Sequence, residues 1–338
     1  MRFELEVLVR RGSAVESRHH LQCAAVDASG TLLAGTPNAG LVTMFRSSAK
    51  PFQLLPLVER GHAERLGFTD EQLAVMAASH TGSRYHVQLV TGILEQLGLG
   101  PGALACGYHD PEDAGSRDDL LRGGAPRTAL YNNCSGKHAG MLALALAEGW
   151  PIEGYHLPAH PMQQLLRQVI AEVCEISPAS MESGTDGCNL PVFALPLPSM
   201  ARGYARLAAA RADAPEARTR ALARIARAMG AHPRTVEGDG RTATQLMLAT
   251  GGRVVAKGGA EGLMLLALTD RGTGVAVKCE DGAGRALAPT AVAVLERLGA
   301  LDGAELATLA PQRRPVVRNV IGAEVGRLEP SVREVALA

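Results

Sequence analysis

The sequence predicts a mixed α/β fold, in which a largely antiparallel sheet has helices packed on it. Segments with strand character gather near both ends of the chain, and segments with helical periodicity occupy the middle. Regular alternation of strand and helix would instead favour a parallel sheet. Because both ends supply strands, we expect one sheet built from the two terminal regions, with the middle of the chain packed on it.

The N-terminal strands are predicted from two segments of strand character. Residues 3–12 (FELEVLVRRG) form one predicted strand, and residues 16–35 form a hairpin around the turn Ala28-Ser29-Gly30. Residues 47–60 then favour a helix, although two prolines obscure its exact limits.

The middle of the chain carries amphipathic or apolar helical segments. Thr69 is a typical N-cap residue for the first of them. Residues 135–148 are rich in alanine and leucine, so this helix should be buried. Serine, glycine and proline dominate residues 177–200, which predicts a loop. The predicted helices are 69–79, 83–97, 135–148, 161–176, 214–229 and 241–250.

The C-terminal third returns to strands. Three segments have strand character, and a tight Asp270–Gly272 turn joins the last two of them. A helix and one more strand complete the predicted order. The predicted strands are 253–257, 263–269, 274–280 and part of 314–328, and the helix is 288–298.

Composition excludes several classes of protein. The 338 residues include 34 basic and 34 acidic side chains, so there is no charge surplus for nucleic acid or an anionic membrane. Apolar runs are too short to span a bilayer, and charges interrupt the apolar stretch at the N-terminus, unlike in a signal peptide. We therefore expect a cytoplasmic protein with one domain, residues 1–338, or two intimately packed subdomains.

Cysteine and lysine usage indicates which side chains are candidates for metal binding and for amine chemistry. The six cysteines are scattered and lack CxxC spacing, which predicts buried thiols or a metal site rather than disulfides. Only four of the 34 basic residues are lysines. Because arginine cannot act as a neutral amine, these few lysines are the candidates for amine chemistry.

The first candidate pair is Ser47 and Lys50. Their spacing puts both side chains on one face of a helix. A serine hydroxyl becomes a good nucleophile when a base takes its proton, and burial or a nearby cation can prepare a lysine for that role. The pair is therefore a possible nucleophile and base. The alternative is a capped helix start with a surface lysine.

The second candidate is a metal site. Cys134 and Lys137 open a predicted helix, where the helix terminus favours a thiolate, and Cys188 follows in a glycine-rich loop with Asp186. Two thiolates with a neutral amine or imidazole can hold zinc and leave one position open. Because lysine is an unusual zinc ligand, the residues alone favour His138 as the third ligand. The alternative is that the cysteines are small buried apolar residues.

The third candidate lies around Lys257, where a strand ends in a lysine and two glycines. The segment is similar to the Lys-Thr-Gly strand of β-lactamase-like enzymes, and glycines there let a substrate lie against the strand edge. Ser79 is expected to end a helix with an exposed hydroxyl. The alternative for Ser79 is a plain C-cap.

Together these segments resemble the rhizobial-type L-asparaginase family, also called asparaginase II, over nearly the whole chain. The matching segments are FRSSAKPFQ, ASHTGS, CGYH, NNCSGKHAGML, GTDGCNLP, KGGAEG and GVAVKCEDG, in the family's order. The resemblance implies hydrolysis of L-asparagine to L-aspartate and ammonia. It also implies a serine-β-lactamase-like α/β fold and a homodimer.

The resemblance also implies roles for the two serine–lysine pairs. Ser47 would be the nucleophile with Lys50 as its base, and Ser79 with Lys257 would be a second pair. Which serine attacks stays open at this point. The family's His-Trp-Pro after Cys-Gly is His109-Asp110-Pro111 here, a departure that could alter substrate fit.

In the same resemblance, Cys134, Lys137 and Cys188 match the ligands of one zinc per chain, with water as the fourth ligand. Such a zinc would position the substrate or order the site rather than generate hydroxide. The implied substrate contacts are Asp186 and, as looser assignments, Arg46 and His138.

Two other functions fit the same residues. One is another serine–lysine amidohydrolase, such as a glutaminase or a peptide amidase. The other is a protein without enzymatic activity that uses Cys134 and Cys188 to sense zinc or to hold it structurally.

Overall fold

The computed structural model describes residues 1–123 and 126–335. The chain divides into two compact units. The first, here called the sheet unit, comprises Met1–Ser48, Leu195–Ala209 and Gln245–Ala338. The second, the helical unit, comprises Ala49–Ala194 and Ala210–Thr244. The last three residues of the predicted domain, 336–338, lie outside the described residues, and the single-domain assignment stays a prediction.

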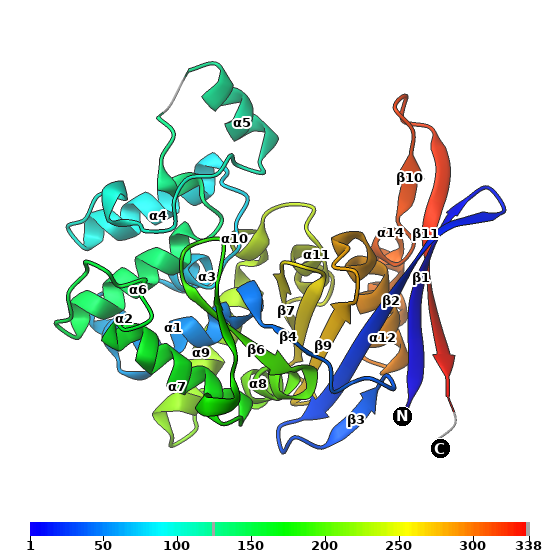
Figure 1. Cartoon of the computed structure of the whole chain (residues 1–338), viewed down its shortest axis with the longest axis horizontal. Helices are drawn as coiled ribbons and strands as arrows, with labels where there is room; N and C mark the ends of the chain where they lie inside the picture. The colour runs from blue at the N-terminus through cyan, green and yellow to red at the C-terminus, as the bar shows by residue number, and fades with distance from the viewer. Residues whose placement is uncertain (124–125, 336–338) are drawn as a thin grey trace. The chain divides into compact units, whose positions relative to one another are not determined.

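The sheet unit confirms the predicted sheet from both termini. Its strands lie in the order β10-β11-β1-β2-β9-β8-β7, with β3 paired to β2. Each of these pairings is antiparallel, and β1 lies beside β11 (Figure 1). The strands are β1 (Phe3–Arg11), β2 (Ala14–Asp27), β3 (Leu32–Gly35), β7 (Val254–Gly259), β8 (Leu263–Leu268), β9 (Thr273–Cys279), β10 (Val316–Arg318) and β11 (Glu324–Glu334).

Helices cover both faces of the sheet. The helix α8 (Leu197–Ala209) packs on β2, β8 and β9, while α12 (Leu287–Arg297) packs on β1, β9 and β11. Every residue of β8 is consequently buried, as expected for a strand covered on two sides. A Cβ on Gly274 would overlap the backbone of Ala201 in α8, so only glycine permits this close approach.

In the helical unit, α6 is buried from Ser135 to Ala145. Four helices, α1, α3, α4 and α7, pack against α6, and α9 lies on α1 and α3. These elements are α1 (Lys50–Glu59), α3 (Asp70–Met76), α4 (Arg84–Gln96), α6 (Ser135–Ala147), α7 (Pro161–Cys174) and α9 (Ala217–Ala231). The predicted buried helix at 135–148 is therefore confirmed.

Local capping signals predicted helix starts well. Thr69 and Gln72 form a capping box at α3, and the Ser83 hydroxyl accepts a hydrogen bond from the His86 N–H at α4. The predicted end of α3 is wrong, because the helix stops at Met76. Ser79 therefore lies three residues beyond the helix instead of ending it.

The loop predicted at 177–200 is also wrong in part. This segment contains β5 (Ser183–Thr185), β6 (Pro191–Pro196) and the start of α8. All residues of β6 except the last are buried, so tertiary packing overrides the proline-rich composition. Pro198 lies in the first turn of α8, where its missing N–H has no cost.

Several short elements were not predicted at all. They are α2 (His62–Arg65), β4 (Val42–Met44), α5 (Ala114–Leu121), α10 (Pro233–Glu237), α13 (Gly303–Thr308) and α14 (Ala310–Arg313). The helix α11 (Thr242–Ala249) was predicted correctly. All six cysteines are free and buried, which confirms the absence of a disulfide framework. Within the described ranges, no helix has the length and apolar character needed to span a membrane.

Candidate active site

Lys50 and Ser79 form a buried serine–lysine pair in the helical unit. Lys50 begins α1 and is fully buried. Its Nζ donates a hydrogen bond to Ser79 Oγ at 2.8 Å and others to the carbonyl oxygens of Ala78 and of Asn133, the latter at 3.4 Å. This pairing was not predicted from the sequence, which instead indicated the pairs Ser47 with Lys50 and Ser79 with Lys257.

The segment that carries Ser79 is held by backbone and ring hydrogen bonds. The Ser79 N–H donates to the carbonyl of Val236 at 2.9 Å. The His80 ring accepts the Gly82 N–H at Nδ1, so its Nε2–H donates to Ser135 Oγ at 2.8 Å. Burial, with help from the neighbouring His86, holds the pKa of His80 well below its usual value. His80 is therefore a neutral ring that fixes the segment.

Cys134, Lys137 and Cys188 meet in the same unit. Lys137 Nζ donates to Cys188 Sγ at 3.0 Å, and the Cys188 thiol hydrogen-bonds to Cys134. This hydrogen bond holds the pKa of Cys134 well below its usual value and raises that of Cys188. Burial lowers the pKa of Lys137, but the two sulfur atoms outweigh burial and raise it overall. The cluster thus brings two sulfur atoms and one amine together in a buried position.

A close contact between helices brings the Cys134 turn toward the end of α3. A Cβ on Gly136 would overlap the carbonyl of Val75, so glycine is required there. Asn132 fixes the turn itself, because its Oδ1 accepts the Cys134 N–H at 2.9 Å and its Nδ2 donates to the Cys106 carbonyl at 2.9 Å. The metal-ligand candidates are thus carried by a rigid helix start.

Cys188 lies in a tight turn that also carries Asp186. The Asp186 carboxylate accepts the Gly187 N–H at 2.8 Å, and its own N–H donates to the Leu190 carbonyl at 2.8 Å. Asn189 adopts a left-handed conformation with φ 67°, which asparagine tolerates better than most residues. The turn leaves Asp186 half-exposed and Cys188 buried.

Comparison with protein families identifies what these residues belong to. The family model of L-asparaginase II matches residues 7–330. The chain belongs to the L-asparaginase II family. It is therefore an asparaginase-type amidohydrolase that acts on a small molecule. None of the curated proteins matches the chain significantly.

The sheet unit of this family member carries the remaining candidates. Arg46 and Ser47 lie in a 3-10 turn (Arg46–Ala49), and Arg46 has φ 48°, a strained value for a residue other than glycine. Ser48 Oγ donates to the Lys257 carbonyl at 3.1 Å, which ties the turn to β7. Lys257 is fully buried, and its Nζ donates to the Gly258 carbonyl at 2.9 Å.

The donor set at the cysteine cluster fits zinc. Two sulfur atoms and one primary amine are gathered, and Cys134, Lys137 and Cys188 are each at most 5% exposed. Lys137, rather than His138, is the side chain that contacts the Cys188 sulfur. His138 is fully buried and bonds through Nδ1 to the Tyr155 hydroxyl at 2.6 Å. Burial first, and then the charge of Lys137, keeps the pKa of His138 well below its usual value.

His109, in the segment that departs from the family pattern, supports the Lys50 environment. Its Nε2 accepts the Asn133 N–H at 2.8 Å, and its Nδ1 donates to the Asp110 carbonyl at 2.8 Å. The Asn133 carbonyl in turn accepts from Lys50. The departure at Asp110 therefore leaves this contact of His109 intact.

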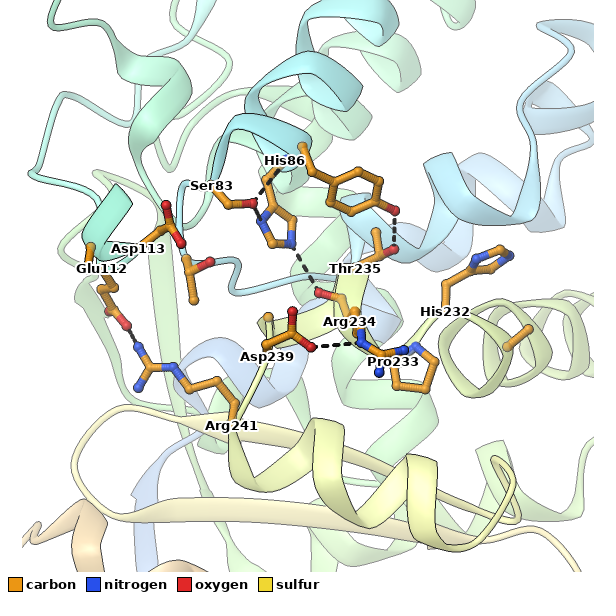
Figure 2. Close-up of a pocket in the computed structure, with 15 residues that line it drawn as sticks. Ser83, His86, Glu112, Asp113, His232, Pro233, Arg234, Thr235, Asp239 and Arg241 are labelled. Carbon is orange, nitrogen blue, oxygen red and sulfur yellow. Dashed lines mark hydrogen bonds and ion pairs between the residues drawn. The ribbon is translucent and has the colours of Figure 1, made fainter. Parts of the chain in front are cut away.

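A cavity of about 590 Å³ in the helical unit was not predicted from the sequence. It begins at Thr81, two residues after Ser79, and Figure 2 shows Ser83 and His86 facing the short helix α10, which contains Arg234. Ser83 Oγ lies 2.6 Å from His86 Nδ1, and His86 Nε2 donates to the Arg234 carbonyl at 3.1 Å. The lining comes from three separate segments (81–86, 112–114 and 231–241), which no local pattern connects.

Proposed function

We propose that the chain is an L-asparaginase that hydrolyses the side-chain amide of L-asparagine to L-aspartate and ammonia. The observation that supports this most is the fully buried Lys50, with Nζ 2.8 Å from Ser79 Oγ, in a chain of the L-asparaginase II family. A buried amine against a hydroxyl is the arrangement that activates serine chemistry.

Amide hydrolysis needs a nucleophile, a stabiliser for the oxyanion and a proton for the departing ammonia. In the proposed mechanism, the Ser47 hydroxyl attacks the amide carbon and Lys50 takes its proton. Ser79, hydrogen-bonded to Lys50, passes that proton to the leaving nitrogen. Lys257 is assigned with Ser79 to the second serine–lysine pair, as the family resemblance implies. Water then releases aspartate from the ester by the reverse proton transfers.

Substrate recognition is assigned to side chains whose charges are opposite to those of the substrate groups that they bind. The Asp186 carboxylate is half-exposed in its turn and suits the α-ammonium group of asparagine. Arg46, on its strained turn, suits the α-carboxylate, because a guanidinium can bind a carboxylate with two hydrogen bonds. Holding both groups fixes the distance to the side-chain amide and so selects side-chain length.

We further propose that Cys134, Lys137 and Cys188 hold one zinc per chain, with water as the fourth ligand. When bound, zinc would order the helix start and the Asp186 turn and so position substrate. Without it, the hydrogen bond from Lys137 Nζ to Cys188 Sγ links the same segments. The proposed role is structural support of the site.

Replacing Cys188 with alanine is expected to remove the bound zinc. Elemental analysis should give about one zinc fewer per chain in the variant than in the wild type, because two remaining ligands bind zinc weakly. Cys23→Ala, which removes an equally buried thiol from β2, is the matched control and should keep its zinc. Equal zinc in Cys188→Ala and wild type would contradict the assignment.

Asparagine is expected to be the better substrate by about 10–200-fold in kcat/KM over glutamine. An extra methylene moves the amide away from the nucleophile when both α-groups are held, and such a mismatch costs about 1–3 kcal/mol. Steady-state ammonia release from the two amides is the measurement that tests the proposed function. Comparable kcat/KM values would favour a glutaminase, and absence of release from both would favour a zinc-binding protein without activity.

The predicted homodimer and the cytoplasmic location stay predictions. Neither enters the mechanism above, because each proposed role is assigned to residues of one chain.

A further inference from the structure

Three side chains with metal-binding atoms meet in the sheet unit, away from the cysteine cluster of the helical unit. They are His19 from β2, Cys279 at the end of β9 and Asp281 just after it. One ring nitrogen, the sulfur and a carboxylate oxygen all lie within 4.8 Å of one another. The mechanism proposed above uses none of these residues.

The strand register explains why these side chains meet. Leu21 pairs with Cys279 between antiparallel β2 and β9, and the Glu280 N–H donates to the His20 carbonyl at 2.9 Å. Two residues further along this register, His19 lies opposite Asp281. Because alternate residues of a strand share a face, the two side chains lie on the same face as Cys279. Because Gly274 faces α8, Cys279 belongs to the opposite face, which α12 covers. The cluster therefore stands on a rigid scaffold.

Hydrogen bonds define the protonation of the cluster. Cys279 Sγ–H donates to Asp281 Oδ1 at 3.0 Å. Arg285 Nε–H donates to His19 Nε2 at 2.9 Å, so the ring proton is on Nδ1, which donates to Asp281 Oδ2 at 2.6 Å. Two protons thus point at the carboxylate from the atoms that would ligate a metal. Their replacement by one divalent cation keeps all three groups satisfied.

We propose that His19, Cys279 and Asp281 form a binding site for one thiophilic divalent metal ion of the zinc class, with one open position. A thiolate and a carboxylate together neutralise the two charges of the ion, and imidazole is a common third ligand. Ligands around a tetrahedral zinc stand roughly 3.5 Å apart, so the observed cluster needs only a small contraction.

Burial and access suit such a site. His19 is 5% exposed and Cys279 is fully buried, whereas the Asp281 side chain is 48% exposed. An ion can therefore enter along Asp281 and reach two desolvated ligands. Binding releases the thiol proton to solvent and moves the His19 proton from Nδ1 to Nε2, which frees Nδ1 for the metal.

Arg285 opposes this shift of the ring proton. In the present arrangement its N–H donates to Nε2, where the proton must arrive, so the guanidinium has to turn away before metal binds. Arg285 is exposed, and its guanidinium also donates to Ser17 Oγ at 3.0 Å. Rotation of this exposed side chain away from His19 therefore costs little free energy. Removal of the guanidinium should consequently strengthen metal binding.

Cobalt(II) titration of the full-length chain tests the proposal, because a thiolate bound to cobalt gives a strong near-ultraviolet band. The Cys188→Ala background weakens metal binding at the cysteine cluster of the helical unit, so the cobalt signal reports mainly on the proposed site. Because His19, Cys279 and Asp281 have no role in the proposed mechanism, a negative result would leave the proposed asparaginase function untouched. We expect this protein to take up about one cobalt with a thiolate band. The band should vanish when Cys279→Ala is added and persist when Cys23→Ala is added instead.

Two conservative variants keep the test informative if Cys279→Ala disturbs folding. Asp281→Asn, at a half-exposed side chain, should weaken cobalt binding by about 100-fold or more, since ligand loss exceeds the effect of losing a supporting contact. Arg285→Gln should strengthen it. A thiolate band that is absent from the Cys188→Ala protein, or unaffected by the cluster variants, would overturn the proposal. It would show that the three residues form a hydrogen-bonded cluster that does not bind metal.

Discussion

Replacement of Lys50 by arginine is expected to lower kcat for asparagine by about 100-fold or more while circular dichroism stays unchanged. Arginine keeps the charge and much of the volume but removes the lone pair that accepts a proton. Because Lys50 Nζ is fully buried against Ser79 Oγ, no water can substitute for it readily. The measurement is kcat by ammonia release at saturating asparagine.

The matched control is the same substitution at Lys278, a buried lysine of β9 to which no catalytic role is assigned. Lys278→Arg should keep kcat close to that of the wild type. A lysine base must lose its own proton first, and a free lysine has a pKa of about 10.4, so activity should rise with pH toward the alkaline side of neutral. Near wild-type kcat with an unchanged pH profile in Lys50→Arg would move the base role to Lys257.

Replacement of Ser79 by alanine is expected to lower kcat by about 10²–10⁴-fold, the usual range for loss of a proton-transfer group. The variant removes the hydroxyl that accepts the 2.8 Å hydrogen bond from Lys50. Ser83→Ala is the control, since this serine caps α4 and its loss should cost about 1 kcal/mol of stability without a comparable fall in kcat.

Mass spectrometry of quenched reactions distinguishes the roles of the two serines. If Ser47 attacks, Ser79→Ala should still form an aspartyl ester on Ser47, whereas Ser47→Ala should form none. An ester found on Ser79 in the wild type would reverse the two assignments and make Ser47 the relay.

Local signals in the sequence were sufficient to predict most strands and helices of the observed fold. Alternating apolar residues predicted the terminal strands, and Thr69 and Ser83 marked true helix starts. The error at 177–200 arose because β6 is stabilised by burial in the folded chain, while its composition is typical of a loop. Local patterns carry no information on such tertiary packing.

The same limit applies to the candidate site. Cys134 and Lys137 were identified together because they open one helix, but the Lys50–Ser79 contact joins residues 29 apart in the chain. The contact between His19 and Asp281 spans 262 residues. Contacts of this kind depend on the strand order and on helix packing, so spacing along the chain does not reveal them.

Product analysis with asparagine labelled in the side-chain amide nitrogen tests the proposed asparaginase activity directly. We expect the purified chain to release labelled ammonia and L-aspartate in equal amounts, and Lys50→Arg to release about 100-fold less in the same time. Failure of the folded, zinc-loaded wild-type chain to release labelled ammonia would contradict the proposal that it is an L-asparaginase.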